Sequence, residues 1–96
     1  MTRDGTYIIG RAPGSGSRSR NRLVLDHPTV SHRHAELLVL AGTYYLTDLG
    51  SRNGIWRESG GRPERLAEGY VRLDERLWFG QCETTLARLL GDEVAA

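Results

Sequence analysis

The fold of this chain is decided by residues 35–56, which read AELLVLAGTYYLTDLGSRNGIW. Two apolar segments, 35–40 and 44–48, flank the turn Ala41-Gly42-Thr43, as expected of a β-hairpin. The run Gly50-Ser51-Arg52-Asn53-Gly54 is the strongest turn signal in the chain, because Asn-Gly readily adopts the positive φ angles of a tight turn. Short strands joined by tight turns predict an all-β domain.

The rest of the sequence continues this pattern on both sides. We expect further short strands at residues 6–9, 23–25, 55–56, 71–73, 77–79 and 84–89, with Leu66 contributing to another. Residues 12–21 (APGSGSRSRN) and 57–62 are polar and rich in glycine, so we expect exposed loops there. Residues 86–90 are apolar enough for a helix but too short for periodicity to decide. Many short strands without a long amphipathic helix indicate an antiparallel β-sandwich or barrel.

Size and composition set further limits. The 96 residues, of which 26% are charged and 39% hydrophobic, suit one globular domain. No apolar run approaches the roughly 20 residues that a membrane span requires, and no signal-peptide core follows the N-terminus, so we expect no membrane attachment. The single cysteine, Cys82, cannot form an internal disulfide, which favours a reducing, cytoplasmic location.

Basic charge is concentrated in the first third of the chain. All thirteen basic residues are arginines, which a GC-rich coding sequence would explain, although the planar guanidinium group also suits phosphate. Five of them lie between residues 10 and 34 with only one acid, Asp26, in a chain whose net charge is +1. Such a local cluster favours a focused anion site over an extended nucleic-acid surface.

Three groups of polar residues lie at expected strand ends. They are Gly10-Arg11, Ser31-His32-Arg33-His34 and residues 50–54. Because alternate loops of a sandwich emerge at the same end, and loops carry function on a rigid scaffold, we expect the three groups to converge.

The chemistry of these groups suits a phosphorylated peptide. Arg11, with Arg33 or Arg52, offers paired N–H donors to phosphate oxygens, and Ser31 offers its hydroxyl and its backbone N–H. Asn53 carries an acceptor and two donors, which suit the backbone of an extended peptide. A phosphothreonine brings about 1.5–2 negative charges at neutral pH. Hydrogen bonds to charged groups contribute about 1.5–3 kcal/mol each, so a handful supports about micromolar binding.

Taken in order along the chain, these motifs resemble the forkhead-associated (FHA) domain family. The resemblance runs from about Thr6 to Leu89 and rests on Gly10-Arg11, residues 21–36 (NRLVLDHPTVSHRHAE), residues 45–55 (YLTDLGSRNGI) and residues 71–80 (VRLDERLWFG). It implies an antiparallel β-sandwich of about ten or eleven strands that binds phosphothreonine peptides through loops at one end. We expect this domain to span residues 1–90, followed by a flexible acidic tail at residues 91–96.

The resemblance also implies roles for the polar loops. Arg11 and Ser31 match the main phosphate ligands of the family. Arg52 matches the position that contacts phosphate or the adjacent main chain. Asn53 matches the residue that hydrogen-bonds the peptide backbone just after the phosphothreonine.

Neighbouring positions take supporting roles in the same comparison. His32 occupies a second loop position that faces the phosphopeptide, and Arg33 lies beside it. His34 matches the histidine that braces the loops from inside without touching the ligand. Gly10 and Gly54 are expected to support the binding loops.

This sequence departs from the family pattern at His32, where arginine or asparagine is usual. A histidine changes its charge near pH 6–7, so we expect affinity to fall as the pH rises through that range. Protonation of the phosphate at lower pH opposes the trend.

A second departure lies before Gly10. Family members usually place one or two strands ahead of the strand that ends in Gly-Arg, and the first of these pairs near the C-terminal strand, whereas only about five residues precede it here. Without the usual first strand, either the chain is a minimal version of the fold or a sheet edge is open, and an open edge invites pairing with another chain. We therefore expect an edge-strand homodimer or a strand supplied from elsewhere.

Other classes of function leave weaker signals. A sandwich could mediate assembly or autoinhibition without reading phosphate, with an acidic side chain in the anion site. Ser31 beside His32 or His34 resembles a nucleophile and a base, but no third catalytic group or oxyanion hole accompanies them, so we expect no enzyme. We expect no nucleic acid as a partner, because the basic cluster is local; weak, steeply salt-dependent binding that is independent of phosphothreonine would reveal one.

The remaining expectations concern partners, cofactors and the core. The expected partner is a phosphothreonine-containing protein, namely a Ser/Thr kinase or its substrate. His27, His32 and His34 have no cysteine or acid at a matching spacing for zinc, so neither a metal nor another cofactor is expected. Four large side chains are expected in the core: Tyr45, Leu46, Trp78 and Phe79. Trp56 belongs either to the core or to the binding surface.

Overall fold

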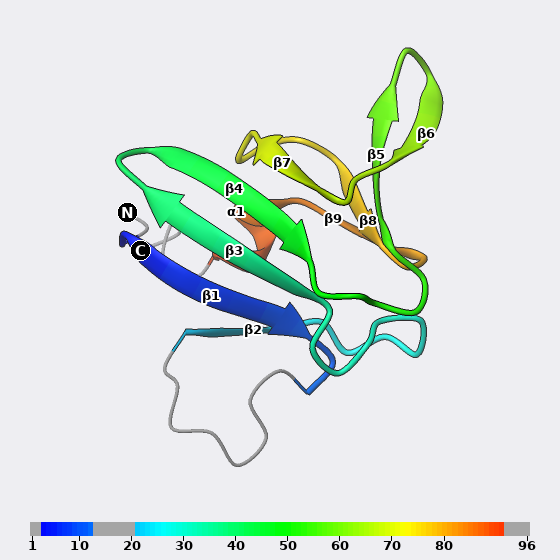
Figure 1. The fold of residues 1–96 in the computed structure, drawn as a ribbon, viewed down its shortest axis with the longest axis horizontal. Coiled ribbons are helices and arrows are strands. Elements are labelled where there is room, and N and C mark those ends of the chain that lie inside the picture. The colour runs from blue at the N-terminus through cyan, green and yellow to red at the C-terminus, as the bar shows by residue number, and fades with distance from the viewer. Residues whose placement is uncertain (1–2, 13–20, 92–96) are drawn as a thin grey trace.

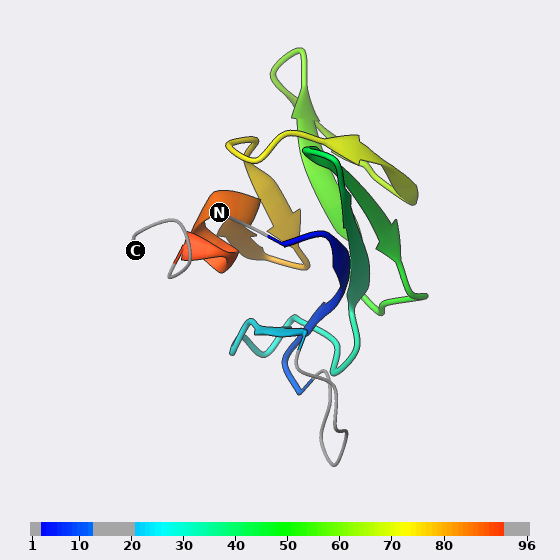
Figure 2. The same ribbon diagram turned by 90° about the vertical axis from the view of Figure 1, so that its left-hand side faces the viewer.

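Two β-sheets pack face to face to form a sandwich, which Figure 1 shows with its strands labelled and Figure 2 shows from the side. This computed structural model describes residues 3–12 and 21–91. Most of the predicted loop at residues 12–21, and all but the first residue of the predicted tail at residues 91–96, lie outside the described residues. The predicted all-β sandwich is confirmed.

The first sheet has five strands in the order β2-β1-β3-β4-β7. Their bounds are β1 Gly5–Gly10, β2 Arg22–Val24, β3 Ala35–Leu40, β4 Thr43–Asp48 and β7 Glu68–Val71. The β3–β4 pair is the hairpin expected from the sequence, turning at Ala41-Gly42. The β1–β2 pair is parallel, so the sheet is not antiparallel throughout.

The second sheet has four strands in the order β6-β5-β8-β9. Their bounds are β5 Ile55–Ser59, β6 Arg62–Arg65, β8 Leu77–Phe79 and β9 Cys82–Thr84, and the helix α1, Leu86–Leu89, follows directly. All pairs in this sheet are antiparallel. Across the described residues the two sheets contain nine strands, somewhat fewer than the ten or eleven expected.

Burial alternates along β3 and turns one face of the strand toward the core. In β3 the side chains of Ala35, Leu37 and Val39 are buried, whereas those of Leu38 and Leu40 face outward. This is the period of two that a strand with one buried face requires. If β3 paired one residue out of register, its buried side chains would face solvent. Burial in the core therefore fixes the pairing of the strands, and the pairing fixes the positions of the loops at their ends.

The inner faces of the two sheets meet in one continuous core. Ile9, Leu37 and Leu46 come from the first sheet, and Leu77 and Phe79 from the second, and none of the five retains exposed surface. Full burial of side chains of this size contributes about 1.5–3 kcal/mol each. The core therefore supplies a firm base for irregular loops.

The segment 84–89, expected as a strand, becomes the helix α1 after Thr84. Thr85 takes an extended conformation as N-cap, and its side chain accepts a hydrogen bond from the backbone N–H of Arg88 at 3.0 Å. Leu86 and Leu90, four positions apart on one helical face, are both buried in the core. The strand prediction is wrong here because five residues are too few for periodicity to show.

The segment 57–62, expected as an exposed loop, is mostly strand. Residues of β5 and β6 pair as a hairpin around Gly60-Gly61, whose φ angles are +59° and +81°. All four residues of β6 are exposed, so no apolar alternation marks the strand in the sequence. Pro63 has no backbone N–H to donate. On an edge strand such as β6 this is tolerated, because no further strand requires that donor.

The core prediction holds for two of the four large side chains. Leu46 and Phe79 are fully buried, but Tyr45 and Trp78 are partly exposed on the outer faces of the two sheets. Tyr45 contacts Tyr70 edge-on and donates a hydrogen bond to Glu68, which raises the pKa of the Tyr45 phenol. These two side chains were expected in the core, but the two-residue period of a strand places their rings on the outer faces of the sheets.

Candidate functional site

Three connections between strands, and the residues directly after β1, meet at one end of the sandwich, at the lower right of Figure 1. The backbone N–H of Arg11 donates to the carbonyl of Ser31 at 2.9 Å, which joins the β1–β2 and β2–β3 connections. The N–H of Arg52 donates to the Ser31 hydroxyl at 3.1 Å and brings in the β4–β5 connection. The N–H of Gly80, in the β8–β9 turn, donates to the carbonyl of Gly54 at 2.8 Å. The predicted convergence of the three polar groups is confirmed.

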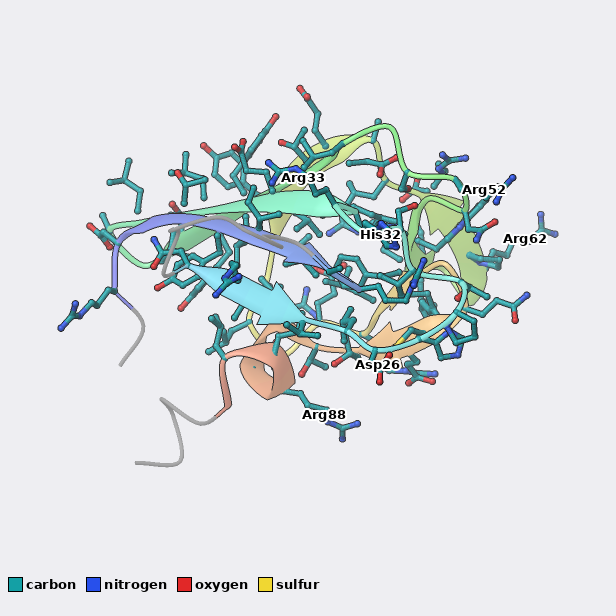
Figure 3. All side chains as sticks on the ribbon, turned by 90° about the horizontal axis from the view of Figure 1, so that it is seen from below. Asp26, His32, Arg33, Arg52, Arg62 and Arg88 are labelled. Carbon is teal, nitrogen blue, oxygen red and sulfur yellow. The ribbon has the colours of Figure 1, made fainter. Side chains whose placement is uncertain are left out.

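A polar pocket of about 430 Å³ opens where these loops meet, and we call it the anion pocket. Its lining residues are Arg11, Pro28, Thr29, Val30, Ser31, His32, Gly50, Arg52 and Asn53. Five of the six predicted binding residues thus line one pocket, while the sixth, Arg33, does not. Arg33 is exposed and lies over the outer side of the five-stranded sheet in Figure 3.

Gly10 brings the first loop close enough to place Arg11. A Cβ atom at Gly10 would overlap the carbonyl oxygen of His32, so only glycine permits this approach of two backbones. The Nε of Arg11 donates to the carbonyl of Val30 at 3.1 Å, which fixes the plane of the guanidinium group. Its two terminal nitrogens have no hydrogen-bond partner among the described residues and remain available to an anion.

His34 connects the loops from within the core. Its side chain has no exposed surface and packs edge-on against the ring of Phe79, with centroids 5.6 Å apart. Its Nδ1 accepts the backbone N–H of Ser31 at 3.0 Å, so its Nε2 carries the proton and donates to the carbonyl of Gly54 at 2.8 Å. The ring is therefore neutral, and it lies in the position expected of a brace that does not reach a ligand.

The geometry of Ser31 corrects one detail of the sequence prediction. Its backbone N–H, expected to serve a phosphate, is donated to His34 instead. Its hydroxyl oxygen accepts the N–H of Arg52, which leaves the hydroxyl proton free to donate. The hydroxyl is thus the group that Ser31 presents to the pocket, and the backbone N–H holds the loop.

The loop from Gly50 to Gly54 is stabilised by its own side chains. The carboxylate of Asp48 accepts the N–H of Ser51 at 3.2 Å, and the Ser51 hydroxyl accepts the N–H of Gly54 at 2.9 Å. Gly54 has a φ of +80°, which a residue with a side chain rarely adopts. These contacts present Arg52 and Asn53 as exposed residues at the tip.

Sequence reasoning missed Thr29 and the β8–β9 turn. The Thr29 carbonyl accepts the Nδ2 of Asn53 at 2.8 Å, and its hydroxyl accepts the N–H of Gln81 at 2.9 Å. A Cβ at Gly80 would meet the Thr29 carbonyl oxygen at 2.5 Å, so glycine is required in this turn as well. Thr29 stands two residues before Ser31, but nothing local in the sequence indicates that it joins three loops.

The charge of the anion pocket is positive. Arg11, Arg52 and His32 lie on its lining, and no acidic side chain is found among the described residues that line it. The nearby carboxylate of Asp48 is occupied by Ser51 and by Arg65, whose guanidinium lies 3.7 Å away. An anion entering the pocket therefore meets donors without a competing acid.

The described residues hold no arrangement for nucleophilic catalysis at Ser31. His34 contacts the backbone N–H of Ser31 and not its hydroxyl, so it is not placed to remove the hydroxyl proton. Burial raises the pKa of the Cys82 thiol, which makes its reactive thiolate scarcer. Within residues 3–12 and 21–91, no cluster of three or more histidine, cysteine or acidic side chains could hold a metal ion. No helix in the described part of the chain is long and apolar enough to cross a membrane.

Comparison with known families identifies the class of protein that this fold and site define. The family model described as the FHA domain matches residues 7–75, which is well over half of the chain. The chain therefore belongs to the FHA domain family, whose members are phosphopeptide-binding modules and generally not catalysts.

Solved structures of this family are similar to the chain. The FHA domain of the CT664 protein from Chlamydia trachomatis has a TM-score of 0.62 and 23% identity, covering 84% of this chain and 74% of that chain; at this identity it supports the fold alone. The FhaA FHA domain, solved in complex with the intracellular domain of Rv3910, has a TM-score of 0.62 and 28% identity, covering 86% and 80%. A structure from work on phosphothreonine-dependent FHA domain interactions has a TM-score of 0.62 and 27% identity, covering 88% and 77%.

Among curated proteins, two chloroplastic zeaxanthin epoxidases are similar over part of the chain. The protein from Spinacia oleracea is 37% identical and that from Prunus armeniaca 43% identical, each over 49 residues. The matched region covers 50% and 51% of this chain but only 7% of either epoxidase. The chain thus spans a small part of the length of these relatives.

Proposed function

We propose that this FHA domain binds a phosphothreonine-containing segment of a partner protein in the anion pocket. One observation carries the proposal: two arginines and a serine hydroxyl, supplied by three separate loops, line one polar pocket without an acid in its described lining. Such a set of donors suits a group with three acceptor oxygens and about two negative charges.

Each lining residue has a distinct part in the proposal. Arg11 offers the terminal nitrogens of its guanidinium group, Ser31 offers its hydroxyl proton, and Arg52 adds a second cation. Asn53 is held at Thr29 through Nδ2, so its Oδ1 remains to accept a backbone N–H of the peptide. His32 adds a donor at the rim.

The relatives support phosphothreonine as the bound group. The solved relative at 27% identity comes from work on phosphothreonine-dependent interactions of FHA domains. On this basis the partner is a phosphorylated protein, either a Ser/Thr kinase or one of its substrates. We also place the domain in the reducing cytoplasm, because its single cysteine, Cys82, is free.

A degenerate phosphothreonine peptide library tests the proposal, compared with the same library lacking phosphate. Wild-type protein is expected to bind only the phosphorylated peptides, and Arg11→Ala is expected to lower affinity at least about tenfold, equivalent to about 1.4 kcal/mol. Arg88→Ala, which removes an exposed arginine from α1 on another side of the molecule (Figure 3), is the matched control and is expected to bind normally.

Equal binding of both libraries would overturn the proposal. Binding to a natural partner that survives phosphatase treatment would instead indicate assembly or autoinhibition without phosphate. Arg11→Ala and Arg88→Ala remove the same charge, so equal losses would point to non-specific attraction.

A further inference from the structure

A group of apolar side chains lies on the outer face of the five-stranded sheet. The strand register puts Leu38 of β3 opposite Tyr45 of β4, and Tyr45 opposite Tyr70 of β7. Leu38 is 40% and Tyr70 67% exposed, and Leu40, the next outward residue of β3, is 56% exposed. Exposed apolar residues are common singly, whereas a contiguous group of them marks an interaction site. We call these four residues the outer patch.

A groove of about 420 Å³ continues the outer patch at its β7 side. Tyr70 lines this groove together with Tyr44 and Leu73, so one residue belongs to both the patch and the groove. Arg72 also lines the groove and is paired with Asp74 at 3.4 Å, which leaves no net charge there. The patch and the groove therefore form one continuous apolar surface.

The groove and the anion pocket are at opposite ends of the same strands. The groove begins at the β3–β4 turn, at the upper left of Figure 1, whereas the loops of the anion pocket are at the lower right. β4 runs from Thr43 beside the groove to Asp48, whose carboxylate holds Ser51 in the β4–β5 connection. Six residues of strand span about 17 Å. A ligand on the outer patch therefore leaves the anion pocket accessible.

The backbone of β7 limits what kind of segment this surface accepts. β7 is the edge strand beside the outer patch, and only four residue pairs join it to β4. The carbonyl of Tyr70 already accepts a terminal nitrogen of Arg57 at 3.3 Å, so a new strand would lack that acceptor. A helix satisfies its own backbone groups and packs an apolar stripe on a sheet face. Leu38 and Tyr70 are two inter-strand spacings apart, about 10 Å, which is close to the width of one helix.

The charge beside the outer patch is negative. Among the outward positions of β3, β4 and β7, the charged residues are Glu36 and Glu68. The hydroxyl of Tyr45 donates to Glu68 at 3.0 Å, which keeps that carboxylate beside the patch. Arg33 is on the same side of the sheet but precedes β3, at the loop end. A symmetric dimer through this face would bring the carboxylates of both copies into one interface, so the charge favours a basic partner over a second copy.

We propose that the outer patch binds an amphipathic helix of a partner protein, with apolar side chains on one face and lysine or arginine beside them. The apolar side chains cover Leu38, Leu40 and Tyr70, and the basic ones pair with Glu36 and Glu68. Recognition requires no phosphate, so the inference goes beyond the proposed function and does not depend on it. The domain can then hold a phosphorylated protein and a basic helix at two separate sites.

Selection from a random display library, made without phosphate and long enough for about four helical turns, tests the outer patch. Selected peptides are expected to carry apolar residues three and four positions apart, with lysine or arginine between them. Leu38→Ser is expected to lower their affinity at least about tenfold, as for a central apolar contact of an interface. Leu49→Ser removes a leucine of similar exposure, 39%, from the β4–β5 connection; it is the matched control and is expected to bind normally.

A second measurement locates the site without any substitution. Addition of a selected peptide to the wild-type chain is expected to shift the backbone amide resonances around Leu38, Tyr45 and Tyr70. The resonances of Arg11 and Ser31, in the loops of the anion pocket, are expected to stay in place.

Several results would contradict the proposal. Enrichment of no peptide, or of acidic peptides, would overturn it, as would equal losses for Leu38→Ser and Leu49→Ser. Shifts confined to the loops would show that the peptides occupy the anion pocket instead. If the wild type self-associated and Leu38→Ser abolished this, the outer patch would be an interface between copies of this chain and the proposal would be wrong.

Discussion

His34 shows how much of the binding end depends on one residue. Its two ring nitrogens join the loop that carries Ser31 to the loop that carries Asn53 through bonds of 3.0 and 2.8 Å. The side chain of His34 is itself fully buried. The histidine thus holds the two loops from within the core and does not line the anion pocket.

Replacing His34 is expected to destabilise the fold strongly. His34→Ala leaves the Ser31 N–H without an acceptor and opens a cavity beside Phe79, so the free energy of unfolding should fall by about 3 kcal/mol. Urea denaturation followed by tryptophan fluorescence measures the change. His32→Ala, two positions away and exposed, is the control and should change stability by less than about 0.5 kcal/mol. Similar losses for both variants would contradict the assigned role.

At His32 the expectation concerns pH. The imidazolium form attracts the phosphate and the neutral form does not, so affinity for a phosphopeptide should fall between about pH 6 and pH 8. The second ionisation of the phosphate, near pH 6, acts in the opposite direction at the lower end. Phosphopeptide titrations of the wild type and of His32→Asn at both pH values separate the contribution of the histidine from that of the phosphate. If affinity changed with pH equally in the two proteins, His32 would have no part in the pH dependence.

Most of the residues that line the anion pocket could be predicted to meet because each lies in a short local motif, whereas their hydrogen-bond partners could not be predicted. Arg11, Ser31 and Asn53 each lie in a short motif whose position along the chain marks a strand end. Thr29 and Gln81 are 52 positions apart and meet through one hydrogen bond, which no local pattern reveals. The sequence also does not show that the backbone N–H of Ser31 donates to His34. This hydrogen bond requires the tautomer of His34 that carries its proton on Nε2, which is defined by the folded geometry.

At the scale of elements, the β7–β8 connection is attached to β5 by a buried ion pair. Glu75 accepts two hydrogen bonds from Arg57, through Nε at 2.8 Å and through a terminal nitrogen at 3.0 Å, and a third from the N–H of Arg72 at 3.1 Å. Arg57 was expected in an exposed loop, but it lies in β5, where its backbone pairs with β6 and β8 and its side chain pairs with Glu75. The partners are 18 residues apart, so the sequence does not show them as a pair.

Removal of this carboxylate should loosen the second sheet. Glu75→Ala leaves a partly buried guanidinium and a backbone N–H unpaired, which should lower the free energy of unfolding by about 2 kcal/mol or more. The adjacent Asp74 pairs with Arg72 on the surface, with 84% of its side chain exposed, and Asp74→Ala should cost less than about 0.5 kcal/mol. Thermal unfolding of both variants makes the comparison, and equal melting temperatures would contradict it.

The strands themselves were predictable where one face is buried. β1, β3, β4 and β8 follow the expected segments closely because their apolar residues alternate or form a short run. β6 has no buried residue, and α1 is a single turn, so neither carries a periodic signal. An element could therefore be predicted from the sequence only where enough of its residues are buried in the core to leave a recognisable apolar pattern.

On the scale of the whole molecule, β2 and β9 are edge strands of the two sheets on the same side of the sandwich. Among the described residues, β2 pairs only with β1 and β9 only with β8. A groove of about 320 Å³ between these edges is lined partly by Val24, Leu25, Cys82 and Leu89. Val24 is 60% exposed there, so an apolar surface accompanies these two edge strands.

This side should accept a further strand, from a second copy or from elsewhere. Light scattering at high protein concentration is expected to show a dimer, which Val24→Lys should dissociate by placing a charge at the edge. Leu40→Lys, at a site 56% exposed on β3, is the control and should leave the mass unchanged. A monomer at every concentration would rule out self-association and leave only an outside strand.

Three of the residues that hold the loops at this end do not line the anion pocket. Gly10, His34 and Gly54 are buried behind it, whereas Arg11, His32, Arg52 and Asn53 are exposed at its surface. Arg11 and Asn53 also hold the loops through their side chains, whereas the side chains of His32 and Arg52 make no hydrogen bond among the described residues. His32 and Arg52 can therefore be randomised as a library while the loops keep their contacts, which makes the domain a scaffold for reagents against phosphorylated sites of choice.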